Sequence, residues 1–183
     1  MDWMNEPGGG EDPVYLVRWA GSSVGGPEGN LRWGLDAADE ALTGNTVCLD
    51  TYLDATQQYI DYCAASGYAT KVFFTTGPVD SYEGESGYQR QLKQDRIRAY
   101  VQADSTRILF DYADILAWND GEVEHTGTWN GHPYQMIHAD NMLDLGGGYV
   151  EDGDHIGERG ALRLGKAVWW MLARIAGWNG NPE

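Results

Sequence analysis

The chain is short, strongly acidic and rich in tryptophan and tyrosine. Its 183 residues carry 12 lysines and arginines against 28 aspartates and glutamates, which gives a formal net charge of −16. A surface with this charge repels nucleic acid and anionic membranes, so we expect neither as a partner, and it favours an extracellular or high-salt setting. The length suits a single domain over residues 1–183. No run of about 18 apolar residues is present, so we expect no membrane-spanning helix.

Three short apolar segments are predicted to be β-strands. The first runs from Val14 to Ala20, after an irregular lead-in at 1–13 that is rich in glycine, proline and acidic residues. The second covers 71–76 and the third covers 107–112. All three combine β-branched and aromatic residues and end near a turn, which is typical of strands.

Apolar residues at helical spacing predict a helix between Asp50, as N-cap, and Gly67, as C-cap. A helix here would hold Cys48 and Cys63 about 20 Å apart, too far for a disulfide. We therefore expect both cysteines to be small buried hydrophobic residues.

Two further helices are predicted downstream. The first covers 88–103 and carries a basic face, which we expect to be solvated. The second closes the chain before Gly177. The basic face of the first helix consists of Arg90, Lys93, Arg96 and Arg98, and the apolar face of the last helix consists of Leu162, Leu164, Val168, Leu172 and Ile175. Trp169 and Trp170 are expected to be core or interface residues.

Short apolar strands that alternate with helices predict an α/β fold, with a parallel sheet covered on both faces. In such sheets the loops at the carboxyl ends of the strands build the functional site. Residues 117–150 show no periodicity and are dense in Trp, His, Asp and Gly. A connection this long is uncommon without a function, so we interpret it as the rim of a site.

The segment before the last helix contains an aspartate, Asp152, three residues before a histidine, His155. An imidazole titrates near neutrality, and a carboxylate beside it fixes its tautomer, so the pair suits a general base and its orienting group. The alternative is that Asp152 and Asp154 are turn or capping residues and that His155 is an ordinary surface histidine.

This block resembles the last block of the SGNH/GDSL hydrolases, whose pattern is D-G-x-H-x-x-x-x-G. Asp152, Gly153, His155 and Gly160 occupy the positions of that pattern, and a closing helix follows. The resemblance implies a three-layer, flavodoxin-like sheet and ester hydrolysis, with His155 as general base oriented by Asp152. It implies no cofactor and no metal.

The chain departs from that family upstream. Gly21 matches the glycine of the family's G-x-N-D block, but Ser23 stands where its oxyanion-hole asparagine is expected, and Val24 where its aspartate is expected. The strand that carries the nucleophile in G-D-S is not found, so the sheet is expected to lack its first two strands. The strand from Val14 to Ala20 would then pair with another copy of the chain, with a partner strand, or with residues 1–13.

A second interpretation of the same serine stays within the chain. Residues 21–25 match G-x-S-x-G, the nucleophile elbow of α/β-hydrolases, directly after a strand. Ser23 would then be the nucleophile, followed in chain order by an aspartate and His155, whereas the SGNH resemblance makes Gly21 and Ser23 the oxyanion-side candidates. Against it, Pro27 and Gly29 follow where a helix should begin. A simple glycine–serine turn is the third possibility.

The 117–150 segment offers two more hypotheses. Its histidines, His125, His132 and His138, are spaced poorly for zinc, whereas Asp120 and Glu122 would suit calcium better. Trp118, Trp129 and Tyr134 are candidates for stacking on sugar rings, or equally for anchoring the loop to the core.

The sequence therefore leaves two functions open. One is an SGNH-like esterase, or its C-terminal part, acting on a small-molecule or polysaccharide ester. The other is a non-catalytic module that binds glycan or assembles as a homo-oligomer.

Overall fold

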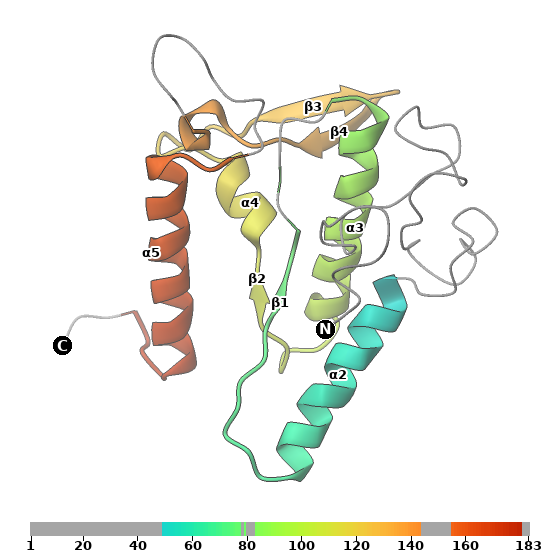
Figure 1. Cartoon of the computed structure of the whole chain (residues 1–183), viewed down its shortest axis with the longest axis vertical. Coiled ribbons are helices and arrows are strands. Elements are labelled where there is room, and N and C mark those ends of the chain that lie inside the picture. The colour runs from blue at the N-terminus through green and yellow to red at the C-terminus, as the bar shows by residue number, and fades with distance from the viewer. Residues whose placement is uncertain (1–48, 78, 80–82, 144–154, 181–183) are drawn as a thin grey trace. The chain divides into compact units, whose positions relative to one another are not determined.

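The computed structural model describes residues 49–77, 79, 83–143 and 155–180 (Figure 1). The chain divides into two compact units, one formed by 1–77 and 88–109 and the other by 78–87 and 110–183. Each unit has its own cluster of buried apolar residues. The strand expected at 14–20 lies outside the described residues, as do Gly21, Ser23 and Asp152. The single-domain assignment and the flavodoxin-like sheet therefore stay predictions.

The first unit contains α2 (Leu49–Ala65), β1 (Phe74–Thr75), most of α3 (Glu85–Gln102) and the start of β2 (Leu109–Phe110). The strands β1 and β2 pair in parallel, and the Phe74 amide donates to the Ile108 carbonyl at 2.8 Å. Both strands are shorter than the apolar segments that predicted them. The core of this unit consists of Leu49, Leu53, Phe74, Ile97 and Val101.

Helix α2 ends as predicted but begins differently. Gly67 adopts a positive φ of 72° after the last turn, a conformation that favours glycine. At the other end Asp50 lies inside the first turn, so it is not the N-cap. Its carboxylate instead binds the guanidinium of Arg96 through two hydrogen bonds of 2.9 and 2.6 Å. Cys63 is a buried free cysteine, as expected, and Cys48 lies outside the described residues.

The basic face predicted on α3 is solvated only in part, because Arg96 is exposed whereas two of the other cations are enclosed. Arg90 and Lys93 are buried, Arg96 pairs with Asp50, and Arg98 pairs with Asp95 at 2.9 Å. The expectation failed because hydropathy alone assigns every cation to water, whereas neighbouring segments can enclose one.

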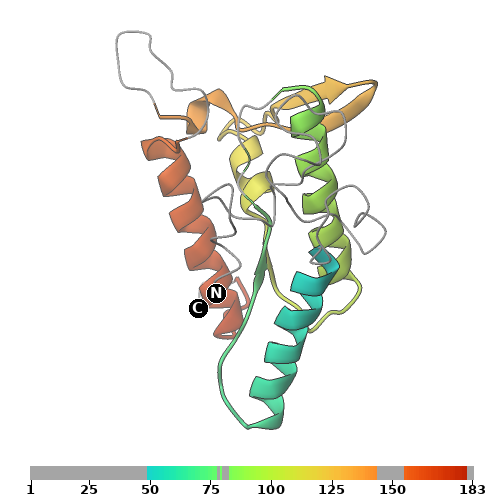
Figure 2. The ribbon, with the colours of Figure 1, turned by 45° about the vertical axis from the view of Figure 1, so that its right-hand side comes forward.

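The second unit contains α4 (Tyr112–Ala117), β3 (Thr126–Trp129), β4 (His132–Gln135), the short 3-10 helix η3 (Ala139–Asn141) and α5 (Glu158–Ile175). Its core brings together Val79, Ala113, Leu116 and Ile137, with partly buried Tyr112, Met142, Ile156 and Leu164 around them. Figures 1 and 2 both show η3 beside the first turn of α5.

The segment 117–150, expected to be a long irregular loop, contains a β-hairpin. Strands β3 and β4 are antiparallel and pair from Thr126 with Gln135 to Trp129 with His132. The two residues between them, Asn130 and Gly131, both have positive φ, 46° and 82°. An Asn-Gly pair of this kind is the preferred two-residue hairpin turn, because its twist matches that of the strands.

Helix α5 buries a different face from the one predicted. Gly160 and Met171 are buried and Leu164 packs on the core, whereas Leu162 and Leu172 are exposed. Val168, Trp169 and Trp170 are exposed as well. The helix is apolar on more than one side, so periodicity could not tell which side packs on the unit. No described helix is long and apolar enough to cross a membrane.

Candidate functional site around His155

His155 lies in a bend immediately before α5 and is exposed to solvent. Its backbone carbonyl accepts a hydrogen bond from the Leu143 amide at 3.0 Å, and the next residue, Ile156, forms a β-bridge with Met142. The Gly157 amide then donates to the Asn141 carbonyl at 2.8 Å. The backbone at His155 is therefore fixed on both sides by the strand-like segment that follows η3.

Two glycines allow α5 to begin this close to η3. A Cβ atom at Gly157 would collide with the Met142 carbonyl, and one at Gly160 would lie 2.6 Å from the Asn141 carbonyl and in contact with Ile156. These are backbone atoms for the most part, which cannot move aside as a flexible side chain would. Gly160 therefore has a packing role, and it is the glycine that follows the histidine in the D-G-x-H-x-x-x-x-G pattern.

Asn141 joins η3 to α4. Its buried side-chain amide donates to the carbonyls of Leu116 at 2.8 Å and Trp118 at 2.9 Å, the last residues of α4 and its C-cap. The Leu116 carbonyl also accepts from the His138 amide at 3.0 Å, so the asparagine is its second donor, and it supplies a donor to the Trp118 carbonyl beyond the helix end. The side chain thus ties the base of the His155 bend to α4, and the sequence analysis did not identify it.

The start of α4 is fixed in turn by Asp111. Its carboxylate accepts from the Asp114 amide at 3.2 Å, an N-cap bond. Tyr112 in the first turn packs against the core, and burial raises the pKa of its phenol.

Two other histidines form a pair beneath the hairpin. The rings of His125 and His138 meet edge to face, with centroids 6.2 Å apart. His125 Nδ1 donates to the Ile137 carbonyl at 2.8 Å, since a carbonyl can only accept. His138 Nδ1 accepts from the Asp140 amide at 3.1 Å, which places the proton of the neutral ring on Nε2. Both rings are thus engaged in backbone bonds and act as structural residues.

The acidic residues of this region are also engaged with neighbours. Gln135 donates to Asp114 at 2.7 Å and to Glu124 at 2.9 Å. Asp120, a candidate calcium ligand, bonds to Arg163 at 2.9 Å. Among the residues that the structure describes, no three His, Cys, Asp or Glu side chains are grouped to hold a metal ion.

The three aromatic residues predicted to contact sugars differ in their surroundings. Trp118 is half-buried, and its indole N–H donates to Asp114 at 3.2 Å. Trp129 is half-buried in β3. Tyr134 is 3% exposed, and its hydroxyl accepts from the Gly84 amide at 2.8 Å. The tyrosine thus anchors the hairpin, the alternative given above, and sugar binding stays a prediction for all three.

The remaining predicted site residues, Asp152, Ser23 and Gly21, lie outside the described part of the chain. The structure therefore places His155 but not its expected partners. In comparisons with known proteins, no family model, no curated protein and no solved structure matches this chain.

Proposed function

We propose that the chain is an SGNH/GDSL-like ester hydrolase, or the C-terminal part of one, in which His155 is the general base. Asp152 orients the imidazole and holds its proton on the ring nitrogen that faces the carboxylate. The other ring nitrogen then accepts the proton of the attacking hydroxyl and later returns it to the leaving group. Ser23 is the candidate nucleophile within this chain, with Gly21 beside it on the oxyanion side.

The observation that carries this proposal is an exposed histidine on a fixed backbone. A general base must reach its substrate, and it must do so from a position that does not drift. His155 is exposed, while the backbone bonds to Leu143 and Asn141 fix the residues around it.

A polysaccharide ester, such as an acetylated sugar, is the substrate class that we favour. Trp118 and Trp129 each present a partly accessible indole on the same unit as His155. An apolar ring with a polar edge suits the face of a pyranose.

Hydrolysis of an aryl acetate tests the base directly. We expect His155→Ala to lose most of any hydrolysis that the chain supports, since a positioned base contributes about 10²–10⁴-fold in rate. His132→Ala is the matched control, because His132 is also exposed but lies on the hairpin strand β4. Equal loss in both variants, or none in either, would remove His155 from the mechanism.

Labelling with a fluorophosphonate then locates the nucleophile. Modification of Ser23 that disappears in His155→Ala supports a complete site within these residues. If no serine of the chain is labelled, either the nucleophile lies on another polypeptide segment or the chain is not catalytic. Loss of a triad serine costs about six decades in rate.

The second candidate function is a self-assembling module, and the outer face of α5 favours it. Trp169 is 77% exposed and Trp170 is 57% exposed, with Leu172 and Trp178 also accessible. An exposed apolar patch of this kind is typical of a protein interface. Light scattering of the chain and of Trp169→Ser would test it: a dimer that dissociates in the variant supports assembly, and a monomer in both rules it out.

A further inference from the structure

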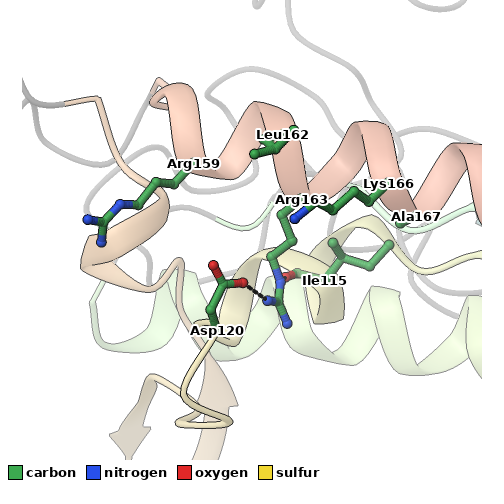
Figure 3. A pocket seen from close by; sticks show the side chains of 7 residues that line it. All are labelled: Ile115, Asp120, Arg159, Leu162, Arg163, Lys166 and Ala167. Carbon is green, nitrogen blue, oxygen red and sulfur yellow. Dashed lines mark hydrogen bonds and ion pairs between the residues drawn. The ribbon is translucent and has the colours of Figure 1, made fainter.

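A cavity of about 310 Å³ opens beside the first half of α5 in the second unit. Figure 3 shows its lining side chains, most of which come from α5, with one from α4 and one from the segment after it. They are Ile115, Asp120, Arg159, Leu162, Arg163, Lys166 and Ala167. None of these residues takes part in the function proposed above.

The cavity concentrates positive charge on an acidic protein. Arg159, Arg163 and Lys166 are three of the 12 basic residues in a chain of net charge −16. Asp120 is the one carboxylate among the lining residues, so the lining has a formal charge of +2. Anions in solution are repelled by most of this surface and attracted here.

The positions of the three basic side chains on α5 bring like charges close together. They occupy positions i, i+4 and i+7 of α5, so neighbouring like charges face each other, which costs about 0.2–0.5 kcal/mol for each pair. Arg159 also lies in the first turn, beside the N-terminal end of the helix, which carries partial positive charge. A bound anion would relieve both repulsions.

The cations have donors left for a ligand. The Arg163 guanidinium is held in place, donating from Nε to the Ile115 carbonyl at 2.6 Å and from Nη1 to Asp120 at 2.9 Å. Arg159 is mostly exposed and reaches Asp140 only at 3.9 Å. Within the described part of the chain Lys166 makes no ion pair. One cation is therefore pre-positioned, and the other two can close on an anion.

The remaining lining is apolar and restricts the kind of anion. Ile115, Leu162 and Ala167 contribute hydrocarbon surface between the charged groups. We propose that this cavity binds a small organic carboxylate with a short apolar body, its carboxylate meeting Arg159 and Lys166 and its hydrocarbon part covering Leu162. This proposal is independent of the role of His155.

Titration of the 183-residue chain with sodium butyrate tests the proposal, followed by amide NMR shifts along α4 and α5. We expect saturable shifts at Ile115 and Leu162 that sodium chloride at equal ionic strength does not produce. Lys166→Met should weaken binding about two- to fivefold, the range that an exposed ion pair supports. Arg159→Gln together with Lys166→Met should weaken binding more than Lys166→Met alone, because both cations of the proposed contact are then lost.

The control variant is Arg174→Gln, which removes a cation from the other end of the same helix, where Arg174 bonds to the Trp178 carbonyl instead of lining the cavity. It should bind butyrate as the unmodified chain does. Arg159 and Lys166 are both exposed, so we expect their substitutions to leave the fold intact. The same amide spectra check this. Shifts that chloride reproduces, or that survive the double substitution, would overturn the proposal. Saturable binding of inorganic phosphate without butyrate would also overturn it, because the apolar lining would then have no part.

Discussion

Helices α3 and α5 each have 18 residues, but they differ in which side chains they bury. Helix α3 buries several polar residues, whereas α5 exposes its largest apolar ones. On α3 the ammonium-bearing Lys93 is 0% exposed, and Gln94 and Arg90 are buried with it. On α5 the largest apolar side chains, Trp169 and Trp170, face solvent. The amino acids of a helix therefore do not by themselves determine which face is inside.

The difference lies in what each helix has around it. Two cations of α3 have carboxylate partners, since Arg96 pairs with Asp50 of α2 and Arg98 pairs with Asp95 of the same helix. Helix α5 buries Gly160 and Met171, packs Leu164 on the core and leaves its aromatic side uncovered. Enclosing a charge costs free energy unless neighbouring groups compensate it, whereas an uncovered aromatic face is available for recognition.

The largest effect should come from the buried lysine of α3. Lys93→Ala removes a fully buried cationic side chain and leaves its space and its polar surroundings unfilled. We expect a loss of about 2–5 kcal/mol in the free energy of unfolding, the range for truncating a large buried side chain. Urea unfolding followed by circular dichroism measures it. A loss below about 1 kcal/mol would mean that Lys93 is not enclosed in solution.

Two glycines of α5 provide a matched pair with opposite expected signs. Gly160→Ala places a methyl group against the Asn141 carbonyl and should destabilise the chain by about 1–3 kcal/mol. Gly165→Ala meets nothing within 4 Å and should stabilise it by about 0.5–1 kcal/mol, because alanine favours helix. Thermal unfolding of both variants compares them. Equal effects would contradict the close packing of α5 on η3.

A smaller effect is expected for the exposed aromatic side of α5. Trp169→Ala removes a side chain that contributes little to its own unit, so the free energy of unfolding should change by less than about 0.5 kcal/mol. The same urea measurement applies, at a concentration low enough to suppress assembly. A loss as large as that of Lys93→Ala would show that the tryptophan is covered and would abolish the contrast between the helices.

The smallest effect concerns Asp104, just beyond the end of α3. Its carboxylate accepts from the Thr106 amide at 2.9 Å and hydroxyl at 2.8 Å. The backbone bond first, and the hydroxyl bond second, lower the pKa of Asp104 below its ordinary 3.8. A lowered pKa contributes stability above the ordinary value, and that contribution disappears as the pH falls through the lowered one.

A carboxyl-detected NMR titration should therefore find the Asp104 midpoint below 3.8, and Thr106→Val should raise it toward that value, since the hydroxyl bond is lost. An unchanged Asp104 midpoint in Thr106→Val would mean that the hydroxyl bond does not lower the pKa of this carboxyl.

The regular elements of the fold could largely be predicted from the sequence. Apolar spacing located α2, α3 and α5, and apolar segments located β1 and β2, because both depend on local pattern. The β3–β4 hairpin was missed although Asn130-Gly131 is its signal, because the surrounding segment lacks alternation. Burial of Lys93 could not be predicted, since a lysine is ordinarily exposed and its hydropathy gives no sign of enclosure.

The candidate site was predictable only in part. The position of His155 before a helix follows from the chain order, and Gly160 was noted as part of a pattern. The reason for that glycine, close approach to the Asn141 carbonyl, needs the structure. Asn141 itself carries no sequence signal, because an asparagine that bonds two helix-end carbonyls looks like any polar loop residue.

The most direct test of the central proposal is the tautomer of His155, read from two-bond proton–nitrogen NMR spectra. If Asp152 orients this ring, the proton should reside on the nitrogen that faces the carboxylate, Nδ1, and Asp152→Asn should shift it toward Nε2. His132, on the hairpin, should be unaffected by the substitution. A His155 ring with the same tautomer in both proteins would contradict the account.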